Sequence, residues 1–210
     1  MNSEGKCEYC KELFSATAMT KHLLWCVARK KKFSDKGNHE TFLMMASSGP
    51  FFVYFEVDAD ATLEKIDEFL RVIWFEYEHL SAFTIENVKY NSKCNDSEQN
   101  LNHKLSNILD TNSSFSYEYD FGTPTKINLK VLQKRIGSQK RIEVIARNNP
   151  PEIKCRCGNR AKTICSKCIW EKSSLFCFGC AKNHICGEEK MLPVVNSPRM
   201  GMCGYMGDGY

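Results

Sequence analysis

The chain has 210 residues, of which 42% are apolar and 11% aromatic, with a net charge of +4; these are values of a folded protein, not of a disordered one. No apolar run reaches the ~18 residues needed to cross a bilayer, and residues 1–10 lack an apolar signal core, so we expect a cytoplasmic protein with no membrane contact. Residues 1–37 and 149–210 each carry a net charge of +4, whereas residues 38–148 carry −4.

The first cysteine motif lies in residues 1–33. Four side chains of metal-ligand type have the spacing C-x2-C-x11-H-x3-C: Cys7, Cys10, His22 and Cys26. A helix over residues 20–29 would place the last two on one face. The motif resembles a single ββα zinc finger that ends in cysteine, with a central gap one residue shorter than usual, and this resemblance implies one zinc ion. The alternative is an amphipathic helix beside two unrelated cysteines.

A basic run, Arg29 to Lys32, follows this motif. It could contact nucleic-acid phosphates, but the exposed helix positions offer little for reading base edges: Ser15, Thr17, Ala18 and Lys21. The basic ends could therefore bind either a nucleic-acid backbone or a protein partner. Residues 34–49 are polar and small, which predicts a linker.

Residues 50–148 are expected to form an α+β domain with two layers, a mainly antiparallel sheet and two helices. The pattern predicts, in order, a strand at 51–57, a helix at 60–74, a hairpin around Glu86–Asn87, a helix at 97–109, and strands at 114–121, 125–136 and 140–148. The last three should form a meander. The aromatic row of the first strand favours a buried core over a surface for stacking bases: Phe51, Phe52, Tyr54 and Phe55.

This middle segment resembles the plasmid pRiA ORF-three-like family, whose members are sometimes described as mobile-element passengers with a resolvase-like label. The resemblance is carried by Leu63, His79, Leu80, Phe83, Tyr90, Tyr119, Asp120, Phe121 and Gly122. The closing stretch 192–205 resembles the zinc-bearing prokaryotic members, many of them archaeal, so an archaeal or bacterial source is implied. Thr123, Thr125 and Ile127 depart from the acidic residue, Trp and His of many members.

No catalytic residue is assigned from the sequence. A nucleophilic serine with arginines, or a tyrosine with basic partners, does not stand out. His79 and Asp120 are the candidate pair for an enzyme, but we expect Asp120 to cap the turn at Gly122 and His79 to make a hydrogen bond where the helix meets the strand. Cys94 is expected to be a lone thiol.

The dipeptide Pro150–Pro151 leads into a cysteine-rich segment, predicted to be a double-zinc module with a tail over residues 152–210. It holds four ligand pairs: Cys155 and Cys157, Cys165 and Cys168, Cys177 and Cys180, and His184 and Cys186. Clustered cysteines in a reducing compartment are more often metal ligands than disulfides, and four pairs make two tetrahedral zinc sites.

Two pairings of these motifs are possible. The interleaved order resembles B-box-like and other cross-braced zinc modules, and this resemblance implies that the first pair joins the third and the second joins the fourth. Consecutive pairing is the alternative, and Cys203 could replace a weak ligand. In a segment too short for an adequate apolar core, metal binding would supply the missing folding energy.

Together these motifs predict three zinc ions in a non-enzymatic adaptor or regulatory protein that binds nucleic acid or protein. The two alternatives are a metal-dependent or resolvase-like nucleic-acid enzyme and a structural or assembly protein whose C-terminal tail docks on a partner or on the middle domain.

Overall fold

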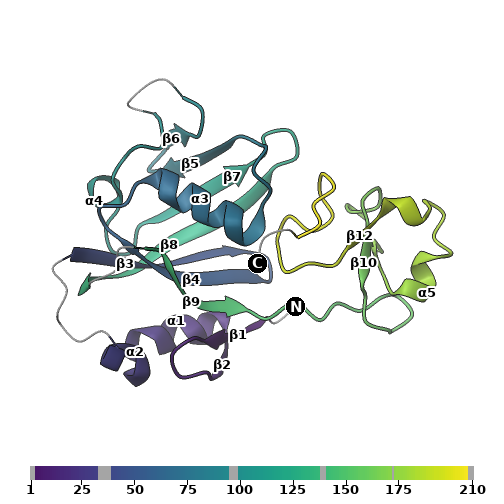
Figure 1. Ribbon diagram of the computed structural model, residues 1–210, viewed down its shortest axis with the longest axis horizontal. Helices are drawn as coiled ribbons and strands as arrows, with labels where there is room; N and C mark the ends of the chain where they lie inside the picture. The colour runs from purple at the N-terminus through teal and green to yellow at the C-terminus, as the bar shows by residue number, and fades with distance from the viewer. Residues whose placement is uncertain (1–2, 33–38, 95–98, 138–140, 172, 208–210) are drawn as a thin grey trace. The chain divides into compact units, whose positions relative to one another are not determined.

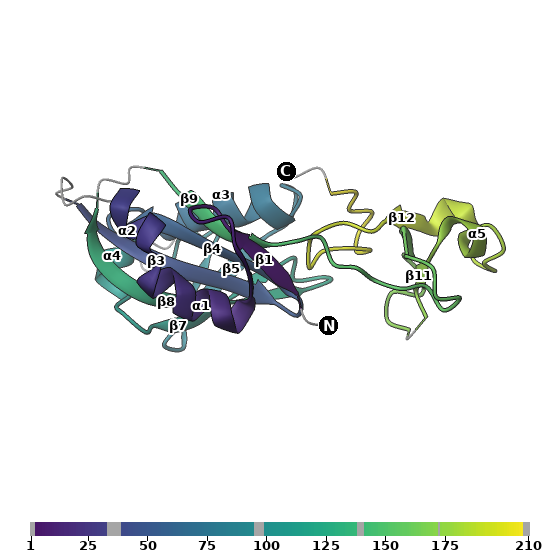
Figure 2. The same ribbon diagram turned by 90° about the horizontal axis from the view of Figure 1, so that it is seen from below.

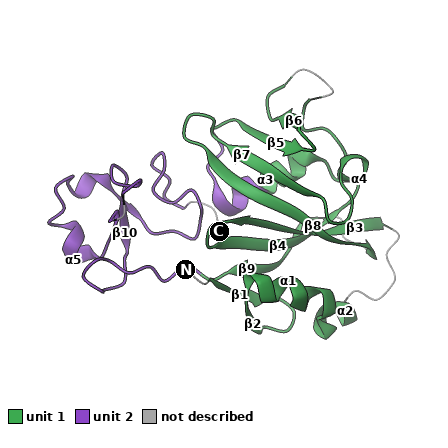
Figure 3. Ribbon diagram, turned by 180° about the vertical axis from the view of Figure 1, so that it is seen from behind, with its two compact units in different colours: residues 1–69, 79–149 green, residues 70–78, 150–210 purple. Residues whose placement is uncertain are grey.

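The computed structural model describes residues 3–32, 39–94, 99–137, 141–171 and 173–207. The chain divides into two compact units, shown in Figure 3. Unit 1 contains residues 1–69 and 79–149, and unit 2 contains residues 70–78 and 150–210. No helix in the described part of the chain is long and apolar enough to cross a membrane.

Unit 1 is built on one antiparallel sheet, which confirms the predicted α+β class. Its strands are β1 (Glu4–Cys7), β2 (Leu13–Ser15), β3 (His39–Ser48), β4 (Phe51–Asp58), β5 (Ser81–Ile85), β6 (Val88–Asn91), β7 (Ser114–Tyr119), β8 (Thr125–Gly137) and β9 (Glu143–Asn148). Among the described residues these nine strands have the order β2-β1-β9-β4-β3-β8-β7-β5-β6. The two N-terminal strands thus belong to the same sheet as the middle segment.

Residues 39–48, which the sequence placed in a linker, form β3 instead; residues 34–38 lie outside the described residues. This strand pairs with β4 through a tight turn in which Gly49 has a φ of 55°. The strand carries Glu40, Ala46 and two serines, which are not strong strand formers, and its apolar residues Phe42 to Met45 do not alternate with polar ones, so the pattern did not predict it. The hairpin also separates β8 from β9, which pairs with β4 and β1, so the predicted three-stranded meander is wrong.

Helices cover both faces of the sheet (Figures 1 and 2). On β4, the Tyr54 hydroxyl lies 2.6 Å from the Thr20 hydroxyl of α1 (Ala16–Trp25), whereas the Phe55 ring lies 4.6 Å from that of Phe69 in α3 (Leu63–Trp74). Since successive strand residues point to opposite faces, α1 and α3 lie on opposite sides. The aromatic row of β4 is therefore core, as expected.

The second predicted helix is reduced to the single turn of α4 (Leu105–Ile108). Residues 97–98 of this prediction lie outside the described residues. Of the four apolar residues that suggested the helix, Leu101, Leu105 and Leu109 are buried and Ile108 is half-buried. The carboxamide oxygen of Asn100 accepts the backbone N–H of Asn102 at 2.9 Å, a local bond that competes with helix formation.

Unit 2 has a smaller sheet. It contains β10 (Thr163–Cys165), β11 (Leu175–Phe176), β12 (Met191–Pro193), the one-turn helix α5 (Phe178–Ala181) and a 3-10 turn at Glu188–Lys190. The strand order is β11-β10-β12. Beyond β12, Ser197 donates to the carbonyl of Trp74 at 2.6 Å, and the buried Arg199 guanidinium donates to Glu76 at 2.9 and 3.0 Å. The tail is thus held against residues 70–78.

Candidate metal centres

The N-terminal motif is assembled by β1, β2 and α1. Ser15 caps the helix by accepting the N–H of Ala18 at 3.4 Å, so α1 begins at Ala16 rather than at Thr20. The sulfur of Cys10 lies 3.3 Å from Nε2 of His22, and the Phe14 ring stacks on the imidazole with 4.0 Å between centroids. The four candidate ligand atoms all lie within 4.8 Å of one another: those of Cys7, Cys10, His22 and Cys26.

This finger is not a separate domain, because its apolar side faces the core of unit 1. Met19 and Leu23 of α1 are fully buried and belong to one cluster with Tyr54 and Ile145 of the sheet. Gly5 brings β1 close to β9, where a Cβ would collide with the carbonyl oxygen of Arg147. A metal ion bound by these four side chains would therefore stabilise the core of the sheet as well as the finger.

The basic run after the finger is divided between core and surface. Arg29 is buried and donates to Glu56, to the carbonyl of Leu23 at 2.7 Å and to Gln133 at 3.2 Å. Arg29 is therefore unavailable to a phosphate, which corrects part of the expectation for this run. Lys30 remains exposed, with its ammonium 4.5 Å from the centre of the Trp25 ring.

The C-terminal ligand pairs form two tetrads in unit 2, in the cross-braced grouping. One, which we call site A, contains Cys155, Cys157, Cys177 and Cys180; the other, site B, contains Cys165, Cys168, His184 and Cys186. In site A the sulfurs of Cys157 and Cys177 are 3.6 Å apart. In site B, Cys168 lies 3.5 Å from Nε2 of His184 and 3.7 Å from the sulfur of Cys186.

These distances fit a tetrahedral zinc ion. With Zn–S bonds of about 2.3 Å and Zn–N bonds of about 2.0 Å, the edges of such a tetrahedron are ~3.8 Å between sulfurs and ~3.5 Å between sulfur and nitrogen. A disulfide would require about 2.05 Å, and all twelve cysteines are free thiols. The donor sets, one with four sulfurs and two with three sulfurs and an imidazole, are those of structural zinc sites.

The thiols of site A ionise unequally. Backbone N–H groups of Cys157 and Cys177 lower the pKa of Cys155 to about 6, because they stabilise its thiolate. Hydrogen bonding to the thiol of Cys157, followed by that to Cys177, raises the pKa of Cys180 to about 12. Four sulfurs this close repel one another when ionised, so a bound cation would stabilise the tetrad in its fully ionised form.

The structure brings His79 and Asp120 close together, but the Asp120 carboxylate is already engaged by a nearby backbone N–H. Nδ1 of His79 lies 3.7 Å from a carboxylate oxygen of Asp120. That oxygen accepts the N–H of Gly122 at 3.0 Å, with Asp120 at a φ of 63°, so the expected turn-capping role is confirmed. Cys94 belongs to none of the candidate metal-ligand groups found among the described residues.

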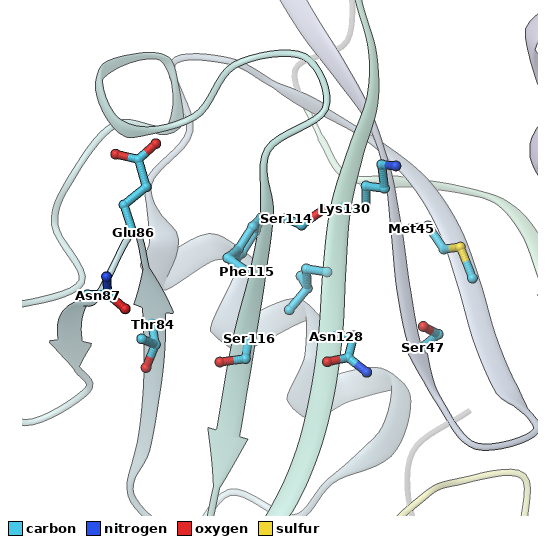
Figure 4. A pocket seen from close by; sticks show the side chains of 11 residues that line it. Met45, Ser47, Thr84, Glu86, Asn87, Ser114, Phe115, Ser116, Asn128 and Lys130 are labelled. Atoms are coloured by element: carbon cyan, nitrogen blue, oxygen red, sulfur yellow. The ribbon is translucent and has the colours of Figure 1, made fainter.

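Sequence reasoning missed a groove, shown in Figure 4, on the face of the sheet that also carries Tyr54. It has a volume of about 690 Å³. Facing positions on four neighbouring strands line up across it, and they carry Ser47, Asn128, Ser116 and Thr84. The alternation in β7 and β8 did predict a wetter face. Hydroxyl and amide groups can hydrogen-bond a ligand, but this row contains no nucleophile next to a base.

No family model matches the chain, and no curated protein matches it. Among solved structures, the chain is weakly similar to the crystal structure of a protein of unknown function from Methanosarcina mazei Go1, with a TM-score of 0.42 and 15% identity over 51% of this chain and 67% of that one.

Proposed function

We propose that this chain is a zinc-stabilised, non-enzymatic adaptor or regulatory protein that binds nucleic acid or protein through its zinc modules. The observation that carries the proposal is the composition of the three tetrads. Each supplies four sulfur or imidazole donors. Four such ligands close the coordination sphere of zinc and leave no position for a reactive water. The metal would therefore support folding, and the surface displayed by the folded modules would carry the function.

The resemblance of residues 50–148 to the pRiA ORF-three-like family supports a link to mobile elements. It also supports the alternative of a nucleic-acid enzyme, for which the approach of His79 to Asp120 is the structural argument. In that alternative, His79→Ala would abolish an activity without lowering the melting temperature. A loss of stability alone would support the structural role.

Metal analysis of the purified native chain tests the proposal, with three zinc ions per chain expected. Cys157→Ser should lower the content by one ion, whereas Cys94→Ser, which changes a thiol outside the tetrads, should leave three. The proposal fails if native protein contains no metal, or if a chelator leaves the melting curve and the near-UV circular dichroism unchanged.

A further inference from the structure

The loops between the metal ligands of unit 2 display an unusual set of side chains. At site A they expose Arg156, which lies between the first two cysteines, and Phe178, which is 64% exposed. At site B they expose Lys167 and Ile185, the latter 96% exposed. Each tetrad thus presents one cation and one apolar side chain on the loops that it holds together.

The charge of this segment is strongly one-sided. Across the described residues of 154–186, the exposed acidic side chain is Glu171, while Glu152, Glu188 and Glu189 are exposed just outside this span. Six basic side chains are exposed in the same span: Lys154, Arg156, Arg160, Lys162, Lys167 and Lys182. Such a concentration of cations on a small module creates a surface that attracts a polyanion.

A second aromatic ring stands beside site B. Trp170 is 74% exposed and follows Cys168 by two residues. A module this small gains more than most from burying a tryptophan, so an exposed one suggests a ligand for its ring. Aromatic rings among lysines and arginines are the features with which proteins bind single-stranded nucleic acid, since bases stack on the rings while phosphates pair with the cations.

We propose that the ligand loops of unit 2 form a binding surface for single-stranded nucleic acid. Phe178 and Trp170 would stack on bases, and Arg156 and Lys167 would contact phosphates. A duplex would not satisfy this surface, because its base faces are already stacked and closed to the rings. The inference rests on the proposed function as a zinc-stabilised binding protein and assigns its partner class. Stacking on a base face also implies low sequence preference.

Fluorescence anisotropy of a labelled 12-nucleotide oligo-dT with the zinc-loaded full chain tests this inference. The expected slope of log affinity against log salt is negative, at about −0.7 per phosphate contacted. Trp170→Ala should weaken binding roughly tenfold. The matched control is Tyr77→Ala, because Tyr77 is also an exposed aromatic residue, at 67%, but lies outside the ligand loops and the finger. Arg156→Ala and Lys167→Ala should each reduce the salt slope, whereas Lys126→Ala on β8 should not.

Three outcomes would overturn the inference. The first is no binding at 50 mM salt by a chain carrying three zinc ions, and the second is an equal effect of Trp170→Ala and Tyr77→Ala. The third is stronger binding of a duplex or of an acidic peptide than of oligo-dT. None of these would remove the proposed zinc-stabilised function, because that depends on the metal content of the same sample. A chain without metal would overturn the proposed function instead.

Discussion

Glu56 is a fully buried carboxylate at the junction between the finger and the sheet. It accepts hydrogen bonds from Arg29, and from Nε of Arg135 at 3.0 Å. Glu56→Gln removes the negative charge, so the guanidinium groups of Arg29 and Arg135 lose the carboxylate that both of them contact. Breaking a buried ion pair on one side costs about 3–5 kcal/mol, so we expect the free energy of unfolding of the zinc-loaded protein to fall by that amount in urea titrations.

The control for this change is Glu118→Gln. Glu118 is partly exposed and lies 3.6 Å from Lys126, a pair in which solvent limits the contribution to about 0–1 kcal/mol. If the two variants lose the same stability, Glu56 does not hold the junction together.

Single residues also show where sequence reasoning reached its limit. The hairpin at Glu86–Asn87 was predicted, and both residues have positive φ values, 47° and 70°; asparagine tolerates that conformation, so the signal is local. Arg29 was read as part of a surface run with Lys30. Its burial depends on Glu56, 27 positions away in the chain, and no local pattern reports such a partner.

At the scale of elements, α1 links the N-terminal metal site to the sheet. Its residues Met19 and Leu23 pack in the cluster of Tyr54 and Ile145, so loss of metal should loosen this side of the core. We expect His22→Ala to increase the hydrogen exchange of β9 and of the neighbouring β4 amides. The matched control is Cys94→Ser, a thiol of the same unit outside the tetrad. Unchanged exchange in β9 and β4 would mean that the finger folds independently of the sheet.

Elements were predictable where the local pattern matched the final environment. The strong alternation of β7 and β8 and the helical stripe of α3 gave elements close to those observed. The spacing of the finger motif predicted the four side chains that lie together. It could not predict that β1 pairs with β9, because pairing between strands more than a hundred residues apart is determined by tertiary packing. The position of β3 between β4 and β8 also depends on tertiary packing, so the local sequence did not predict it.

At the scale of the whole molecule, the two units differ in what holds them folded. In the part of the chain that the structure describes, unit 1 has nine strands with buried aromatic side chains, whereas the strands of unit 2 are two or three residues long. The large buried side chains of unit 2, such as Trp74 and Phe75, belong to residues 70–78. Around the two tetrads the buried apolar residues are few and small, among them Ile153, Ala161, Ile164 and Ala181. Two metal ions would supply folding energy that these side chains cannot, since structural zinc contributes on the order of 10 kcal/mol in small zinc-binding peptides.

Removal of metal should therefore unfold unit 2 while most of unit 1 stays folded. After removal of metal from the full chain, we expect hydrogen exchange in β10 and β11 to become fast, as in an unfolded segment. The amides of β7 should keep most of their protection, because this strand does not adjoin the finger strands and its side chains Tyr117 and Tyr119 are fully buried. Adding zinc back should restore the protection of β10. Continued protection of β10 in metal-free protein would show that its fold does not depend on the ions.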